Sequence, residues 1–121
     1  MFLATSNKPK RLLHMSYINR VEPGELRRGL EDLKILLADL PPGFRVLVDF
    51  GRLESMHTAC ATELGRGMEM IDHHGVSLVV RVIPDPSKDI GLNILTLFHY
   101  PHHPRIVTCE NMTEAARALE L

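Results

Sequence analysis

The chain has 121 residues, a formal net charge of −1, 45% apolar residues and 24% charged residues. This length suits a single domain, 1–121, with its own hydrophobic core. The near-neutral charge argues against a nucleic-acid-binding surface, and no apolar stretch approaches the roughly 20 residues of a membrane-spanning helix. The two cysteines, Cys60 and Cys109, have no CxxC spacing, and no signal-peptide pattern opens the chain. We therefore expect a cytoplasmic protein without a disulfide framework, nucleic-acid partner or membrane segment.

The N-terminal part of the sequence predicts a hairpin and then a helix. Residues 2–5 and 11–21 are candidate strands, and Asn and Pro at 7–10 favour a turn between them. A helix is expected to begin at Pro23, because proline suits the first helical position, and Pro41 and Pro42 end it. Five leucines repeat along one helical stripe: Leu26, Leu30, Leu33, Leu37 and Leu40.

The central part predicts a buried strand, a loop and a second helix. Residues 46–50 form an apolar run that is typical of a strand covered on both faces, and residues 51–57 are interpreted as a connection. Residues 58–74 carry a helical pattern. In α/β proteins a strand, loop and helix start often carry chemistry or recognition, because the first helical turn exposes unpaired N–H groups.

The C-terminal part predicts two further strands and two helices. Residues 77–83 are the clearest strand of the chain, and Asp85, followed by proline, is expected to cap a third helix. Residues 105–109 form a last short strand. Asn111, with Glu114 three residues later, has the spacing of a capping box at the start of a final helix.

The whole pattern consists of four strand–helix units, and the segment at residues 2–5 can add one strand before them. Such alternation implies parallel pairing and right-handed crossovers. We therefore predict an α/β fold with a four- or five-stranded, mostly parallel sheet and four helices.

The segment 45–75 resembles the core of the STAS domain, the sulfate-transporter and anti-sigma-factor-antagonist fold. The family pattern is a strand, a short connection and then Asp-Ser-Ser-Gly at the start of a helix. Here the strand is Val-Leu-Val-Asp-Phe at 46–50, and the four motif positions become His57, Thr58, Ala59 and Cys60. Gly-Val-Ser-Leu-Val-Val at 75–80 and the helix at 111–116 match two later family elements. The resemblance spans residues 12–119 and implies a STAS-like fold.

The resemblance also implies a function. In anti-sigma-factor antagonists the second serine of the motif is phosphorylated by the partner kinase. Ala59 stands at that position and has no hydroxyl, and His57 replaces the aspartate, so we expect the usual switch to be lost. Thr58 is the remaining candidate phosphate acceptor, although an N-cap role explains it more simply.

The implied protein is a non-enzymatic bacterial regulatory module whose partner is a kinase-type or anti-sigma regulator. Its expected interaction residues are His57, Thr58, Ala59 and Cys60. Asp85 joins them as part of a polar rim, because both loops follow strands and share the carboxyl edge of the sheet. A simple helix-capping role also accounts for Asp85.

A different class of function uses the same loop as a small enzyme or a ligand-binding site. A cysteine near a helix N-terminus can have a lowered pKa, and His57 lies three residues before Cys60. A small buried cysteine is the plainer interpretation. The enzyme or binder alternative requires a concave, partly apolar pocket at His57–Cys60.

Two further groups of residues have candidate roles. The histidines His99, His102 and His103 could bind zinc, but no carboxylate or HxxxH pair completes a ligand set, so we expect no metal and no cofactor. The segment 90–95 is apolar on more than one helical face, which suggests a homodimer surface or a well-buried helix. The candidate dimer contacts are Ile90, Leu92 and Leu95.

Overall fold

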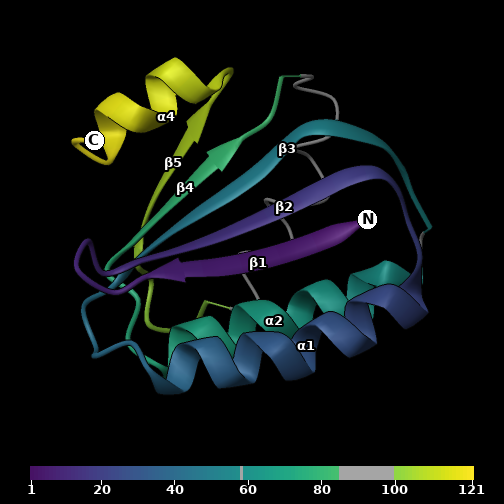
Figure 1. Ribbon diagram of the computed structural model, residues 1–121, viewed down its shortest axis with the longest axis horizontal. Helices are drawn as coiled ribbons and strands as arrows, with labels where there is room; N and C mark the ends of the chain where they lie inside the picture. Colours follow the sequence, from purple (N-terminus) through teal and green to yellow (C-terminus); the bar gives the residue numbers. More distant parts are fainter. Residues whose placement is uncertain (58, 85–99) are drawn as a thin grey trace.

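The computed structural model describes residues 1–57, 59–84 and 100–121. They form one five-stranded sheet with helices on both faces (Figure 1). The strands are β1 (Phe2–Asn7), β2 (Leu12–Val21), β3 (Arg45–Met56), β4 (Leu78–Val82) and β5 (Arg105–Cys109). The helices are α1 (Pro23–Ala38), α2 (Cys60–His73) and α4 (Met112–Ala118). The helix expected after Asp85, the third of the four predicted helices, lies outside the described residues, as do Ile90, Leu92 and Leu95.

The order of the strands across the sheet is the same as their order in the chain, β1-β2-β3-β4-β5. β1 pairs antiparallel with β2, and the other three neighbouring pairs are parallel. The predicted edge hairpin and the predicted mostly parallel α/β sheet are therefore confirmed, with five strands.

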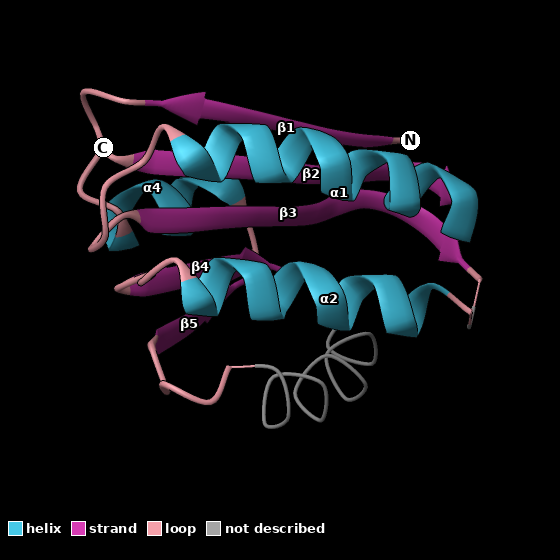
Figure 2. Cartoon of the chain, turned by 90° about the horizontal axis from the view of Figure 1, so that it is seen from below, coloured by secondary structure: helices cyan, strands magenta, loops and turns pink. Residues whose placement is uncertain are grey.

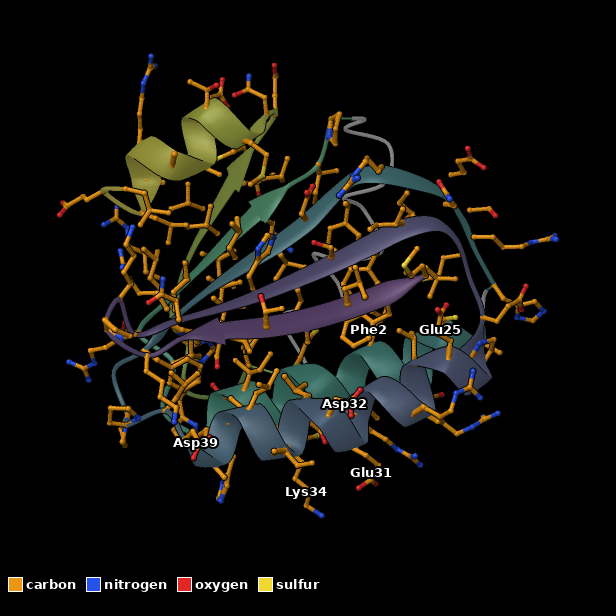
Figure 3. All side chains as sticks on the ribbon, viewed as in Figure 1. Phe2, Glu25, Glu31, Asp32, Lys34 and Asp39 are labelled. Carbon is orange, nitrogen blue, oxygen red and sulfur yellow. The ribbon has the colours of Figure 1, made fainter. Side chains whose placement is uncertain are left out.

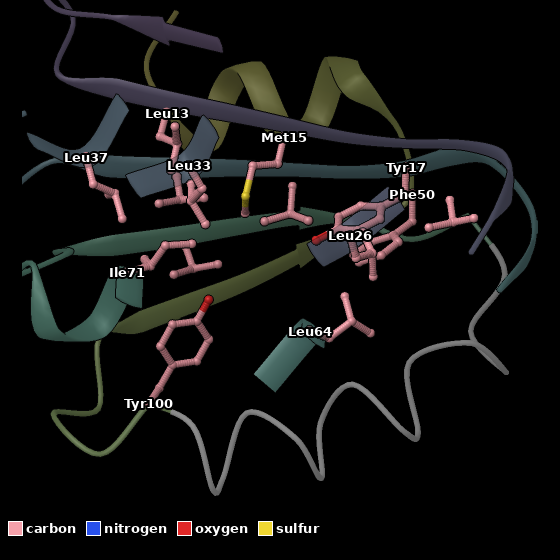
Figure 4. Close-up of a cluster of buried hydrophobic side chains, with 14 of the residues drawn as sticks. Leu13, Met15, Tyr17, Leu26, Leu33, Leu37, Phe50, Leu64, Ile71 and Tyr100 are labelled. Atoms are coloured by element: carbon pink, nitrogen blue, oxygen red, sulfur yellow. The ribbon is translucent and has the colours of Figure 1, made fainter. Parts of the chain in front are cut away.

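The sheet separates two hydrophobic layers (Figure 2). Helices α1 and α2 cover one face, and α4 covers the other face over β4 and β5. Side chains alternate between the layers along each strand, so Val79 packs toward α1 and α2 whereas Val80 and Val82 pack toward α4. The larger core contains the stripe of α1 together with Met15, Tyr17 and other strand residues (Figure 4).

β3 is longer than the sequence analysis predicted. The sequence pattern predicts a connection at residues 51–57, yet the strand runs from Arg45 to Met56. The extra length is held by β2, because Ile18 pairs with Arg52 and Val21 with Met56. Two register shifts along this pairing each accommodate one extra residue in β3. The pairing of β4 with β3 ends at Asp49. Residues 18–21 and 52–56 therefore form a two-stranded parallel extension, which we call the β2–β3 arm.

Two predicted helix starts are confirmed in detail. Helix α1 has Pro23 in its first turn, as expected. At α4, the Asn111 side chain accepts the N–H of Glu114 at 2.9 Å. The Glu114 carboxylate in turn accepts the N–H of Glu110 at 2.9 Å, one residue earlier than in a standard capping box.

Candidate functional site

The loop between β3 and α2 lies at the carboxyl edge of the parallel strands and is tied to two of them. The His57 N–H donates to the carbonyl of Val21, the last residue of β2, at 3.4 Å. The Cys60 N–H donates to the His57 carbonyl at 2.9 Å. The loop is thus fixed to the end of the β2–β3 arm. Thr58 lies outside the described residues, and so do its predicted N-cap and phosphate-acceptor roles.

The His57 side chain caps the start of α2. Its ring is exposed, and Nδ1 accepts the N–H of Ala59 at 3.0 Å. This hydrogen bond assigns Nδ1 as the acceptor of a neutral ring, with the proton on Nε2. An aspartate at this position could accept the same N–H with its carboxylate, so the histidine preserves the capping geometry but not the charge. Ala59 itself is exposed and offers no side-chain cap.

Cys60 does not have the environment of a nucleophile. The residue is fully buried, and its sulfur donates to the Val21 carbonyl at 3.6 Å. Burial raises the pKa of the Cys60 thiol, and the carboxylate of Glu22 raises it further. The hydrogen bond to His57 acts in the opposite direction and is outweighed. The thiol is therefore held protonated, which is the reverse of the lowered pKa that an active-site cysteine needs.

The arm beside this loop presents a polar surface of mixed charge. Its exposed side chains are Asn19, Arg20, Arg52, Glu54 and Ser55. Leu53 and Met56 are half-buried and pack toward the core, which anchors the arm to the domain. We call residues 18–21, 52–57 and 59–60 together the loop-and-arm surface. The other predicted site residue, Asp85, lies outside the described residues.

Two hollows in the described part of the chain lie elsewhere. An interior cavity of about 40 Å³ sits between the sheet and helices α1 and α2, lined by apolar side chains together with Glu63, Arg81 and Tyr100. An open groove of about 630 Å³ runs along α1 and α2 and is lined largely by charged residues and histidines. Neither hollow is lined by His57, Ala59 or Cys60. These hollows therefore do not supply the pocket that an enzyme or binder at His57–Cys60 requires.

Buried polar residues in the main core were not anticipated. The side chain of Glu63 is 6% exposed and forms ion pairs with Arg66 at 3.5 Å and with Arg27 at 3.9 Å. Arg81 is buried and donates to Thr108 Oγ1 at 3.0 Å. The sequence held a signal for both, because Arg81 interrupts an apolar strand and Glu63 lies three residues after Cys60 on the buried stripe of α2.

One histidine of the cluster that was predicted to lie on the surface contacts a buried residue. His102 is not an isolated surface residue, because its Nδ1 lies 2.6 Å from Oδ2 of the buried Asp72.

Within residues 1–57, 59–84 and 100–121, no group of three or more His, Cys, Asp or Glu residues is arranged to hold a metal ion. No described helix is both long and apolar enough to span a bilayer.

Comparison with known proteins gives matches at the level of structure. No family model and no curated protein sequence matches the chain. An uncharacterized DUF3478-family protein with a SpoIIAA-like fold from Shewanella loihica PV-4 superposes with a TM-score of 0.71 at 13% identity, covering 98% of this chain and 92% of that one.

The anti-sigma factor antagonist SpoIIAA matches in two forms. Its unphosphorylated form has a TM-score of 0.64 at 13% identity, over 99% of this chain and 98% of that one. The phosphorylated Bacillus form has a TM-score of 0.59 at 10% identity, over 98% and 99%. At these identities the likeness establishes the fold, and the chain is thus a STAS-like domain with the SpoIIAA-like fold.

Proposed function

We propose that this chain is a non-enzymatic regulatory module of the bacterial cytoplasm that binds another protein through its loop-and-arm surface. The observation that carries the proposal is the match to an anti-sigma factor antagonist over nearly the whole length of both chains. In that antagonist, a domain of this fold is associated with recognition of another protein rather than with catalysis. By that analogy, the partner is a kinase-type or anti-sigma regulator.

The geometry of the loop supports a recognition role. The His57 N–H and the Cys60 thiol both donate to the Val21 carbonyl, whereas the His57 ring and the Ala59 side chain are exposed. A partner therefore meets a preorganised surface, and little conformational entropy is lost on binding. The exposed arginines and Glu54 of the arm add charges that would select the partner and its orientation.

We infer that binding is constitutive rather than switched by phosphate. Ala59 cannot carry a phosphate, and the capping histidine replaces an acidic residue of the family motif. Moving the phosphate acceptor to Thr58 would not require changes at both His57 and Ala59. The two changes together therefore favour loss of the switch. The rival proposal is that Thr58 has taken over as the acceptor, which would bring close to two negative charges to the start of α2.

A small enzyme or ligand-binding protein remains the second proposal, with His57 and Cys60 as its centre. The raised pKa of the Cys60 thiol and its full burial weigh against it. Detection of turnover or of a ligand held at His57 would favour this second proposal over the first.

The test is a pull-down from the native host with the full chain as bait, read by mass spectrometry and followed by titration of the captured partner. We expect wild type and the distant α1 variant Lys34→Glu to bind equally, and the arm variant Arg52→Glu and the loop variant His57→Ala to bind at least tenfold more weakly. A partner that binds all four proteins alike would overturn the assigned surface.

The same titration decides how the module is regulated. Equal affinity of Thr58→Ala and Thr58→Glu supports a constitutive module. A large loss with Thr58→Glu alone would mean that a negative charge at this position controls the interface, and the inference of a lost switch would be wrong.

A further inference from the structure

We propose that His57 is a proton-operated latch. The neutral ring holds the start of α2 in place, and protonation releases it, so that the loop-and-arm surface binds its partner more weakly in mildly acidic conditions. The latch itself is carried by the contacts of the loop, whereas its consequence for binding rests on the proposed function.

The hydrogen bond between His57 and Ala59 exists in only one protonation state of the ring. Nδ1 lies 3.0 Å from the Ala59 nitrogen and accepts its N–H, which requires a lone pair on Nδ1. In an imidazolium both ring nitrogens carry a proton, so Nδ1 would present an N–H to another N–H. Proton uptake therefore replaces an attraction by a repulsion at the start of α2.

The place of this ring at the start of a helix adds to the effect. Helix α2 has 14 residues, and Ala59 is its N-cap. The first N–H groups of a helix together act as about half a positive elementary charge, which attracts anions and repels cations. A protonated His57 would carry the same sign toward that end. The residue is exposed, so its ring can exchange a proton with solvent directly.

The carboxylates of α1 nearest the loop are each paired with a cation. Glu22, at the N-cap of α1, lies 3.5 Å from Arg20 of the arm. Glu25 lies 3.3 Å from the amino-terminal ammonium group at the same end of α1 (Figure 3). Both carboxylates are close enough to Cys60 to raise the pKa of its thiol. Neither forms an ion pair with His57.

The other charged or titratable groups near the loop lie on α2 and on the arm. Glu63 is held by its two arginine pairs, and Cys60 has a raised pKa and stays a neutral thiol. The arm carries two exposed charges of opposite sign, Arg52 and Glu54. Within the part of the chain that the structure describes, no carboxylate forms an ion pair with His57. The lost hydrogen bond is therefore not replaced by an existing ionic contact.

Release of the latch acts on the surface that a partner would meet. The His57 N–H donates to the Val21 carbonyl at 3.4 Å, and the His57 carbonyl accepts the N–H of Cys60 at 2.9 Å. His57 is thus the residue that joins the end of β2 to the start of α2. When its ring is repelled from Ala59, this junction loosens, and a partner must order it again on binding. The ordered surface is present above the pH range in which histidine takes up a proton and is lost as the pH falls through that range.

Nuclear magnetic resonance of the full chain tests the latch without any partner. At about pH 7.5 the ring ¹⁵N shifts of His57 should show a proton on Nε2 and none on Nδ1. Between about pH 7.5 and about pH 5.5 the Ala59 amide resonance should move with the titration of this ring. The protection of that amide against hydrogen exchange should fall about fivefold, as for the loss of a typical helix cap.

His57→Asn keeps an acceptor and removes the titration, because an asparagine carbonyl can accept the N–H two residues ahead at any pH. The Ala59 amide of this variant should not respond over the same pH range. His73→Asn is the matched control, since His73 is exposed at the opposite end of α2, and it should respond like wild type. Equal responses in wild type and His57→Asn would overturn the latch, and so would a wild-type ring with its proton on Nδ1 at about pH 7.5.

The effect on binding is measured with the partner captured in the pull-down. The ratio of the Kd at about pH 5.5 to the Kd at about pH 7.5 should be about fivefold larger for wild type and His73→Asn than for His57→Asn. This comparison cancels any titration within the partner. Equal ratios in the three proteins would overturn the regulatory role of His57. Failure of the proposed surface is seen separately, as unweakened binding of Arg52→Glu at either pH.

Discussion

The carboxylate of Asp72 holds His102 by two contacts: ring Nδ1 lies 2.6 Å from Oδ2, and the backbone N–H donates to Oδ1 at 3.3 Å. Asp72 is in the last turn of α2, and its side chain is 3% exposed. His102 follows Tyr100, which is buried in the main core (Figure 4). The pair therefore joins the end of α2 to the segment that leads into β5.

We expect His102→Ala to lower the free energy of unfolding by about 1–2 kcal/mol, because it removes one hydrogen bond from a buried carboxylate while the exposed histidine limits the gain from charge. Urea unfolding at neutral pH measures the change. His103→Asn is the control, because His103 has a φ of 50°, a conformation that asparagine tolerates. Equal losses in the two variants would mean that the Asp72 contact is not the source of the effect.

Two helical glycines should respond to alanine in opposite directions. A Cβ at Gly67 would lie 3.5 Å from Leu30 Cδ2 and 3.8 Å from Leu33 Cδ2, which is ordinary contact. Gly67 also lines the interior cavity. Gly67→Ala should raise the free energy of unfolding by about 1 kcal/mol through helix propensity and added packing.

A Cβ at Gly29 would lie only 2.3 Å from Cδ1 of Phe2. Gly29→Ala must displace this ring, and we expect a net loss of about 1 kcal/mol, since overpacking exceeds the gain in helix propensity. Thermal and urea unfolding of both variants provide the measurement. A stabilised Gly29→Ala protein would show that Phe2 moves aside freely.

Stability should fall at alkaline pH, and Tyr17 should account for part of the fall. Burial raises the pKa of Tyr17 far above its ordinary value of 10.0, with smaller contributions from Tyr100 and Cys60. The unfolded chain releases this proton near pH 10 while the folded chain keeps it, so the stability present below about pH 10 is lost as the pH rises further.

Tyr17→Phe removes the titrating group and keeps a ring that can stack on Phe50, whose centroid lies 4.7 Å away. Urea unfolding at about pH 8 and about pH 11 should show a smaller pH dependence for the variant than for wild type. An unchanged slope would mean that Tyr17 is ionised in the folded state.

The Cys60 thiol should be protected from thiol reagents in the native protein. It is fully buried and its pKa is raised, so the thiolate that reacts is scarce. Reaction with a disulfide reagent should be slow and should accelerate as urea unfolds the chain. Ser55→Cys, an exposed position on the arm, is the reference for fast labelling. A native Cys60 that reacts as fast as Cys at this reference position would revive the enzyme alternative.

The sequence was most informative where local pattern and tertiary environment agree. The leucine stripe of α1 and the apolar strand β4 follow simple periods, and both elements were predicted close to their observed bounds. The predicted end of β3 came too early, because Gly51 and the polar residues after it resemble a loop. Only the pairing of Arg52 with Ile18 reveals that the strand continues. That pairing joins residues far apart in the chain, so no local pattern could indicate it.

The candidate site was predicted less fully than the fold. His57 was singled out by its place in the family motif, but its capping bond to Ala59 depends on the exact turn of the loop. The contact between Asp72 and His102 joins two segments 30 positions apart, and the exposure of His102 hides it from any argument based on hydropathy. A buried charged residue such as Arg81 can be recognised in the sequence because it interrupts an apolar run. Its interaction partner cannot be recognised in the same way.

The sequential strand order has a consequence for synthesis on the ribosome. Each strand pairs with the one made just before it, so the sheet can grow in one direction from β1 as the chain emerges. The hairpin and α1 can dock before β3 is complete, and every later strand finds its template already in place. A nascent chain of this design never has to leave a gap in the sheet for a strand not yet translated, which limits the time that its unpaired edges are open to misassembly.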